Sequence, residues 1–173
     1  MKQFTVLILI TFITFSGIAQ EPIKEWHGYA NAEISRGIAG YASNYGYMSA
    51  GVAASYGMLL NNRYYIGLGA KPNYIFSDGD FNGFFLPIYA EFKYKSSVNE
   101  KLFGGYGVAR VGYSAVDQRG VYAHIGGGLN YKRWEFGLGI SYQYTKFKEK
   151  HYDDAWYIDY NMVFGTISAG YRF

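Results

Sequence analysis

The sequence predicts an all-β fold, an eight-stranded antiparallel up-and-down β-barrel, and three observations predict it. Apolar and polar residues alternate along successive stretches of about ten residues, which is the period of a strand with two different faces. The chain contains 20 Tyr, 13 Phe and 23 Gly, far from the composition of an average soluble domain. Hydrophobic residues make up 50%, yet mean hydropathy is only -0.11. The apolar residues are therefore spread among polar ones and are not collected into helical spans.

The 173 residues suit one domain after an export signal. Residues 1–19 have the features of a signal peptide: Lys2 is a positive start, Phe4 to Phe15 is apolar, and Ser16 to Ala19 is rich in small residues. A membrane anchor is the alternative, but the apolar run is shorter than the roughly 18 residues that span a bilayer. We expect cleavage after Ala19 and a barrel domain over residues 20–173.

Composition also argues against several classes of function. The chain has no cysteine, so disulfides, thiolate zinc sites and a cysteine nucleophile are excluded. Its net charge is +3, of which Lys2 in the expected leader contributes one unit, and this balance gives no support to nucleic-acid binding. We expect no cofactor and no metal site.

Eight alternating stretches define the strands. One face of each carries Ile, Leu, Val and aromatic residues, and the other carries Gly, Ser, Asn and Tyr with isolated charges. The prolines Pro72 and Pro87 fall inside two of them and are expected to mark rims or bulges. The stretches are Trp26–Ser35, Tyr47–Met58, Tyr64–Tyr74, Leu86–Tyr94, Phe103–Ser114, Val121–Lys132, Trp134–Phe147 and Met162–Phe173.

The connections between strands fall into two groups. Three short basic turns, around Arg63, Lys101 and Arg133, are expected at the rim that also holds both termini. The opposite rim is expected to carry four loops, all short. These loops are Arg36–Gly46, Ser77–Gly83, Ala115–Gly120 and Lys148–Ala155.

A soluble sandwich or a lipocalin-like barrel would also produce alternating strands after an export signal. In such a fold the apolar face lines the core and the other face meets water. Here the second face is rich in Gly, Ser, Asn and Tyr, which suits a polar lumen, and the alternation continues to an aromatic residue at Phe173. The pattern therefore favours a transmembrane barrel in the cell outer membrane, with its apolar face on lipid.

Several diffuse motifs resemble a known family. They are Leu86–Tyr94, the glycine-spaced strands Gly105–Tyr113 and Gly126–Tyr131, and the terminal Gly170–Phe173. In these the chain resembles the small outer-membrane β-barrel proteins of Gram-negative bacteria, the OmpA/OmpX-like barrels and the "porin family" barrels of Bacteroidetes type.

This resemblance implies outer-membrane lipids and lipopolysaccharide as surroundings, and insertion by the barrel assembly machinery, which recognises the last strand. Phe173 and Tyr171 are then the expected assembly signal. The resemblance implies no activity. Because eight strands enclose a space that their own side chains fill, we expect a monomeric barrel with a structural or surface-interaction role and no solute pore.

Charged residues on the inward face are the candidate site. Buried charges have to pair, so a ladder of ion pairs is expected inside the lumen. Counting registers across the loops puts Lys71 in contact with Glu91 and Arg110 beside His124. A proton or ion path is the alternative to simple filling of the lumen. The lumen ion-pair candidates are Glu33, Lys71, Glu91, Lys93, Arg110 and His124, and Lys132, Glu135 and Arg172 share their phase.

Two further functions are weighed. His124-Ile125-Gly126 resembles the pattern of outer-membrane lipid deacylases, but glycine stands where the nucleophilic serine should be, so we expect no enzyme. Ser141, which register counting puts near His124, is the only substitute. The second function is adhesion or ligand recognition through the outer loops, and the residues expected to take part are Tyr41, Tyr45, Tyr47 and Lys148–Asp154.

Overall fold

A computed structural model describes residues 24–44, 46–76, 82–96, 103–117, 119–151 and 154–173. The expected leader and its cleavage site lie outside these residues. The elements are β1 (Lys24–Gly40), α2 (Tyr41–Asn44), β2 (Met48–Leu60), β3 (Tyr64–Ala70), β4 (Asn73–Phe76), β5 (Gly83–Lys95), β6 (Gly104–Asp117), β7 (Gly120–Tyr131), β8 (Trp134–His151) and β9 (Asp154–Arg172).

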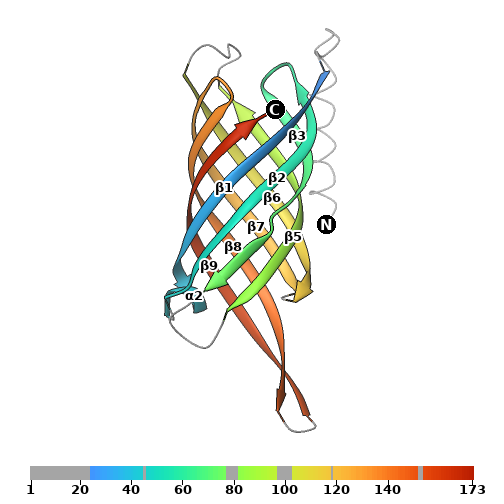
Figure 1. The fold of residues 1–173 in the computed structure, drawn as a ribbon, viewed down its shortest axis with the longest axis vertical. Coiled ribbons are helices and arrows are strands. Elements are labelled where there is room, and N and C mark those ends of the chain that lie inside the picture. The colour runs from blue at the N-terminus through green and yellow to red at the C-terminus, as the bar shows by residue number, and fades with distance from the viewer. Residues whose placement is uncertain (1–23, 45, 77–81, 97–102, 118, 152–153) are drawn as a thin grey trace, which may run out of the picture.

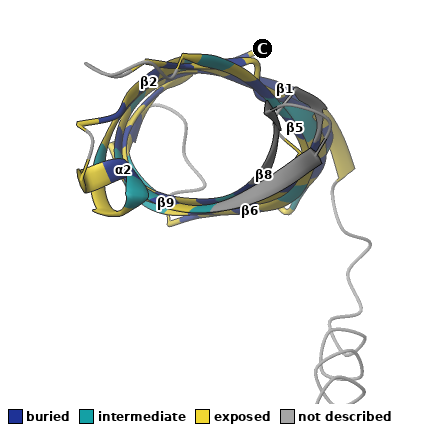
Figure 2. Cartoon of the chain, turned by 90° about the horizontal axis from the view of Figure 1, so that it is seen from below, coloured by how far each residue is buried: buried dark blue, intermediate teal, exposed yellow. Residues whose placement is uncertain are grey.

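The strands form one closed antiparallel barrel. Apart from β3 and β4, strands that follow each other along the chain are paired, and β1 pairs both with β2 and with β9, so the sheet has no open edge around the ring. β3 and β4 both lie between β2 and β5 and are two halves of one barrel strand. The predicted eight-stranded up-and-down barrel is therefore confirmed (Figures 1 and 2).

Both prolines interrupt the regular pairing, as expected. Pro72 falls in the gap between β3 and β4, where its carbonyl still accepts a bond of 3.1 Å from the Val52 amide. Pro87 borders a register shift in the pairing of β5 with β6, which begins at Phe85. A residue without an amide hydrogen is accommodated where the ladder is already irregular.

The rim where β1 begins and β9 ends has tight turns. The Arg63 amide donates to the Leu60 carbonyl at 3.0 Å, and the two residues between them, Asn61 and Asn62, have φ of 51° and 56°. Two positive φ values match the right-handed twist of the flanking strands, and Asn tolerates them well. Lys132, predicted to point inward, is instead exposed in the β7–β8 turn with φ of 56°, which corrects that prediction.

The opposite end departs from the predicted short loops. β1 continues to Gly40 and leads into α2, and β6 and β7 extend to Asp117 and Gly120. The loop predicted at Lys148–Ala155 is wrong, because β8 and β9 stay paired out to His151 and Asp154. They project as a two-stranded ribbon well beyond the other strands (Figure 1). The charged composition of this stretch is compatible with a paired two-stranded ribbon as well as with a loop.

The predicted phase of the strands is confirmed by which side chains are buried, with Lys132 as the exception. Inward side chains such as Tyr29, Lys93 and Thr145 are at most 1% exposed, whereas Leu68 and Ile125 on the outside are about 70% exposed. Figure 2 shows the closed ring of strands with buried and exposed residues intermingled along it. In the described residues, no helix is long and apolar enough to cross a membrane.

The interior is not uniformly polar, contrary to the expectation of a polar lumen. At the end nearest α2, residues of six elements and of the connection before β2 form an apolar cluster that Tyr41 and Tyr160 flank. Aromatic and aliphatic residues therefore close this half of the lumen, and the charges occupy the rest. The apolar cluster consists of Ala42, Tyr47, Ala53, Ile75, Phe85, Tyr89, Tyr122, Met162 and Phe164.

Candidate functional site

Seven charged side chains from different strands meet inside the barrel, and we call them the ionic ladder. β1 supplies Glu33, the gap between β3 and β4 supplies Lys71, and β6 and β8 supply Arg110 and Glu135. Three come from alternate positions of β5, namely Glu91, Lys93 and Lys95. The period of two in β5 places all three on the lumen side. Every side chain of the ladder is at most 5% exposed.

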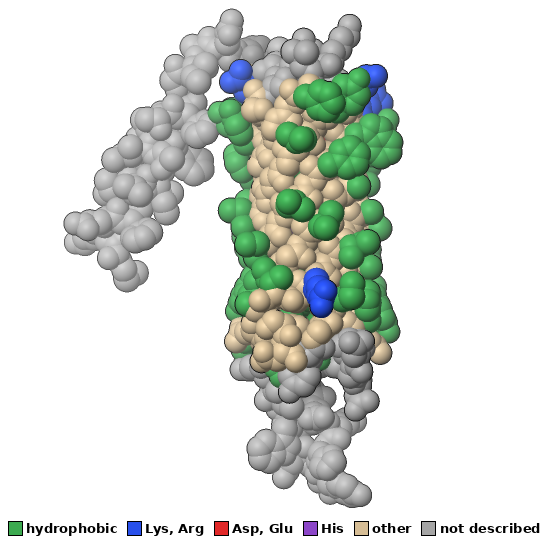
Figure 3. All heavy atoms as spheres, turned by 90° about the vertical axis from the view of Figure 1, so that its left-hand side faces the viewer, with side chains coloured by type: hydrophobic (Ala, Val, Ile, Leu, Met, Phe, Trp, Pro, Cys, Tyr) green, Lys and Arg blue, Asp and Glu red, His purple; other side chains and the backbone are tan. Residues whose placement is uncertain are grey.

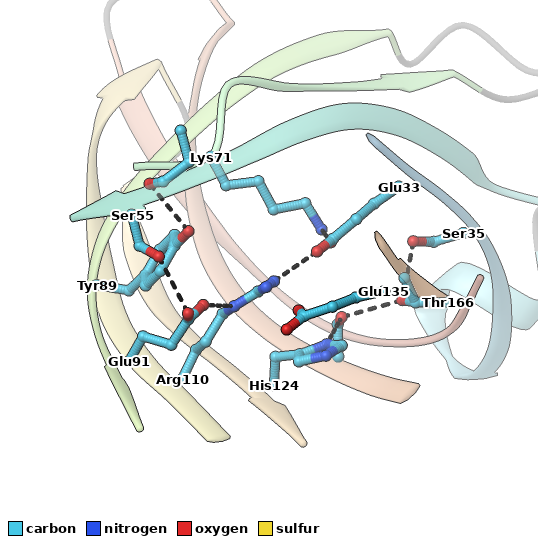
Figure 4. Close-up of polar contacts among 12 residues, drawn as sticks. Glu33, Ser35, Ser55, Lys71, Tyr89, Glu91, Arg110, His124, Glu135 and Thr166 are labelled. Carbon is cyan, nitrogen blue, oxygen red and sulfur yellow. Dashed lines mark hydrogen bonds and ion pairs between the residues drawn. The ribbon is translucent and has the colours of Figure 1, made fainter. Parts of the chain in front are cut away.

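Arg110 is the centre of the ladder. Its Nε donates to Oε2 of Glu91, the residue directly opposite on β5, and its other side reaches Oε1 of Glu33 across the lumen. The planar guanidinium suits this double role, because its donors point to two sides in one plane. Glu33 also binds the Lys71 ammonium at 2.7 Å (Figure 4).

The ladder continues toward the end of the barrel that carries the chain termini. The Lys93 ammonium lies 3.7 Å from Oε1 of Glu91 and 2.6 Å from Oε2 of Glu135. Lys95 follows at 3.4 Å from the other oxygen of Glu135. The Lys93 ammonium also sits 3.7 Å from the ring centroid of Tyr29, where the face of the ring attracts a cation.

The expected contact between Lys71 and Glu91 is wrong. The ion pair that the structure gives Lys71 is with Glu33, and Arg110 occupies the space beside Glu91. The Lys71 amide donates to the Pro87 carbonyl, so Lys71 is level with Pro87. Glu91 lies four residues along β5, or roughly 13 Å at the rise of a strand. Glu33 reaches Lys71 across β2, where Gly51 stands opposite both Glu33 and Asn73.

A second polar group, the hydroxyl row, crosses four neighbouring strands near one level. Ser35 and Thr166 lie 2.9 Å apart between their oxygens, Thr166 and Ser141 lie 3.1 Å apart, and Ser141 is 2.9 Å from Nδ1 of His124. The structure therefore places Ser141 against His124, as register counting predicts, and Arg110 opposite His124 on the neighbouring strand. The row joins β7, β8, β9 and β1 and ties together the seam where the barrel closes.

The His124 and Ser141 pair lacks the other parts of a hydrolytic site. Ser141 is 4% exposed and His124 is 8% exposed, both inside the barrel wall. Among the described residues, no carboxylate hydrogen-bonds the imidazole, and Thr166 is the other partner of Ser141. A nucleophile needs both an oriented base and access for the substrate, and this arrangement offers neither.

The structure brings all six predicted ion-pair candidates into the lumen. Glu33, Lys71, Glu91, Lys93 and Arg110 belong to the ladder, while His124 joins the hydroxyl row. Lys95 was not predicted, although it continues the inward phase of Glu91 and Lys93 by one step. The hydroxyls of Ser35 and Thr166 were also missed, because no local pattern distinguishes a bonded inward hydroxyl from a solvated one.

The two predicted assembly residues lie on the outside, next to the seam. Tyr171 packs edge-on against Trp134, with 5.1 Å between ring centroids. Phe173 exchanges two backbone hydrogen bonds with Gly28, of 2.9 and 3.0 Å, and its ring covers the Cα side of that glycine. Both residues are therefore part of the outer wall where β9 meets β1.

The outer surface of the barrel is apolar over most of its height. Aliphatic residues such as Leu68, Ile88 and Ile125 occupy its middle, each about two-thirds exposed or more. Aromatic rings gather at the rim near the chain termini, where Trp26 stacks on Tyr56 and Phe103 stacks on Tyr131. Figure 3 shows one face of this apolar belt, with Lys and Arg side chains toward its two ends.

Comparisons with known proteins concern the fold. No protein-family model matches the sequence, and no curated protein matches it. Among solved structures, the chain is similar to the N-terminal β-barrel domain of OprF from Pseudomonas aeruginosa, at 12% sequence identity and a TM-score of 0.49. The match covers 85% of this chain and 97% of that domain. The likeness is one of overall barrel shape.

Proposed function

We propose that this chain is an integral outer-membrane β-barrel with a side-chain-filled lumen, whose role is structural or surface-interacting. The observation that carries the proposal is the inverted distribution of its residues. Charges are buried inside the closed barrel, and large hydrophobic side chains cover its outside. The strand motifs that resemble the small outer-membrane barrels of Gram-negative bacteria fit the same proposal.

The size of the apolar belt argues for lipid around it. In the described residues, 28 large hydrophobic side chains are exposed, and they are distributed around the whole barrel. A fully exposed side chain of this kind costs about 1.5–3 kcal/mol to keep in water instead of an apolar medium, and soluble monomers rarely expose apolar patches above a few hundred Å². A closed barrel leaves no backbone edge in the bilayer, which makes this belt compatible with hydrocarbon.

The filled lumen argues against passage of solutes. A continuous water channel would expose the side chains that line it, but those of the ionic ladder are at most 5% exposed and the apolar cluster closes the end near α2. Eight strands generally leave room only for side chains. We therefore propose no pore function, and the buried His124 and Ser141 pair supports no enzymatic one.

Fractionation and gel mobility test the membrane proposal. We expect the protein in the outer-membrane fraction, migrating faster on a detergent gel without heating than after boiling, because the closed barrel resists the detergent. Proteoliposomes that contain it should not swell in isotonic sugar. A soluble periplasmic pool with no mobility shift would refute the membrane assignment, and rapid swelling would refute the filled lumen.

Surface recognition is the second candidate function, and the β8–β9 ribbon favours it. The pairing of β8 with β7 ends at Gln143, and the pairing of β9 with β1 ends at Met162. Beyond them the ribbon continues to His151 and Asp154, and its two outer edges, which pair with no other strand in the described residues, can accept a further strand. It coincides with the Lys148–Asp154 segment expected to act in adhesion.

Shortening the ribbon tests this candidate separately. Replacing residues 147–158 by Asn-Gly joins the paired Lys146 and Asp159 through a two-residue turn. The barrel should still fold and show its mobility shift, because every strand of the ring retains both neighbours. Binding of whole cells to immobilised host matrix or to lipopolysaccharide should fall if the ribbon acts in recognition. Equal binding by both proteins would exclude the ribbon.

A further inference from the structure

The charges of the ionic ladder do not balance. Each carboxylate is shared by two cations: Glu33 by Lys71 and Arg110, Glu91 by Arg110 and Lys93, and Glu135 by Lys93 and Lys95. Positive and negative groups therefore alternate along the ladder, which begins and ends on a lysine. It carries one more positive charge than negative.

One end of the ladder, Lys95, lies near the rim where β1 begins and β9 ends. Lys95 has the weaker contact with Glu135, at 3.4 Å against 2.6 Å for Lys93. Arg172 is buried nearby, 6% exposed and opposite Tyr29 where β9 meets β1, and it adds to the positive field. The excess positive charge of the ladder is costly away from water, so a counter-charge is expected beside Lys95.

An independent observation points to the same place. Tyr29 is 0% exposed, yet its hydroxyl has no hydrogen-bond partner in the described part of the chain. Its ring lies 3.7 Å from the Lys93 ammonium and 5.0 Å from the Lys95 ammonium, measured to the centroid. A buried phenol rarely goes without a partner, and this one has a proton to donate beside two cations.

We propose that a small inorganic anion, of the kind represented by chloride or phosphate, binds inside the lumen beside Lys95 and Tyr29. The anion supplies the missing negative charge and accepts the Tyr29 hydroxyl proton in a hydrogen bond, while the Lys95 ammonium donates to it. Arg172 adds a positive field from the adjoining strand. Lys95 and Arg172 are the last residues of β5 and β9, so the site lies close to the mouth of the barrel.

Thermal unfolding in different salts tests this site. The purified protein in zwitterionic micelles is compared in sodium gluconate, chloride and phosphate at equal ionic strength. An anion present at a concentration ten times its dissociation constant raises the ratio of folded to unfolded protein about elevenfold. This change raises the unfolding temperature by roughly 3–6 °C. We expect this rise for wild type with chloride or phosphate. Arg63→Gln, which removes an exposed cation from the same rim, is the matched control and should respond fully.

Two variants separate binding from folding. Lys95→Gln should lose the rise. Tyr29→Phe keeps every charge and should be no less stable than wild type in gluconate, because the hydroxyl has no protein partner, yet respond less than half as much to chloride. Bromide soaked into crystals should give an anomalous peak beside the Lys95 ammonium. Equal responses of all four proteins, or bromide peaks confined to the outer surface, would overturn the proposal.

Discussion

Charged residues inside the barrel act through shared ion pairs, and Arg110 joins two buried carboxylates. It serves Glu33 and Glu91 together, and both carboxylates are at most 1% exposed. Its double contact also explains why the ladder is continuous between β1 and β5. Without it the ladder separates into two fragments, each with a carboxylate lacking one of its two cations.

We expect Arg110→Met to destabilise the folded barrel by about 3–5 kcal/mol, because it leaves buried carboxylates short of a cation. Urea unfolding in micelles measures this loss. Adding Glu91→Gln should recover part of it, because Glu91 is then left with Lys93 at 3.7 Å, whereas Glu33 keeps Lys71 at 2.7 Å. Arg63→Met on the exposed rim is the control and should change stability little. A loss for Arg110→Met no greater than for that control would contradict the role of the ladder.

At the scale of elements, the β2–β3 hairpin depends on backbone conformation in its turn. Asn61 and Asn62 both have positive φ, which a β-branched residue adopts only at a cost. We expect Asn61→Val to destabilise the barrel by about 1–2 kcal/mol and Asn61→Gly to be tolerated. Urea unfolding checks both. Arg63→Val in the same turn, where φ is not positive, should be nearly neutral, and equal losses would contradict the turn argument.

The seam between β9 and β1 is the second element with a specific requirement. A Cβ built on Gly28 would lie 2.6 and 2.9 Å from two atoms of the Phe173 ring. We therefore expect Gly28→Val to destabilise the barrel by about 1–3 kcal/mol through overpacking. The loss should shrink in a Phe173→Ala background, since that ring is the obstacle.

Gly107→Val is the matched control for the seam. It also faces outward on a strand, but the nearest atom to its added Cβ is 3.9 Å away. Unfolding in urea should show little change for this variant. If Gly28→Val destabilised the barrel equally in the Phe173→Ala background, the contact with the Phe173 ring would not be the cause of the loss.

For the whole molecule, the position of the apolar belt sets how the barrel sits in a bilayer. Ile125 lies near the middle of β7 and Phe103 lies just before β6 at the rim. In lipid vesicles, Ile125→Arg should cost roughly 2–4 kcal/mol and Phe103→Arg about 0–1 kcal/mol, since a charge is least tolerated at the midplane. Unfolding free energies measured in vesicles check the difference. Equal costs would argue against a spanning orientation.

The repeating strand pattern was enough to predict the barrel and its phase. Alternation with period two is a local property, so Glu91 and Arg110 could be assigned to the lumen without knowing their partners. The irregularities at Pro72 and Pro87 were also predictable, since a missing amide hydrogen is visible in the sequence. Pairs of residues on adjacent strands joined by short turns, such as His124 and Ser141, followed from counting.

Contacts across the lumen were not predictable in this way. Lys71 meets Glu33 across the intervening strand β2, where Gly51 stands opposite Glu33 on one side and opposite Asn73 on the other. The β8–β9 ribbon was missed because its charged sequence has the composition of a loop, and only the pairing of the two strands distinguishes the two.

The sequence by itself therefore determined the architecture, the number of strands and which residues face inward, because these depend on periodicity along the chain. Only the tertiary structure decided how the charges pair, where the ladder ends on Lys95, and that aromatic residues close one half of the lumen. These depend on distances across a closed barrel, which shear and strand tilt set together for the whole ring.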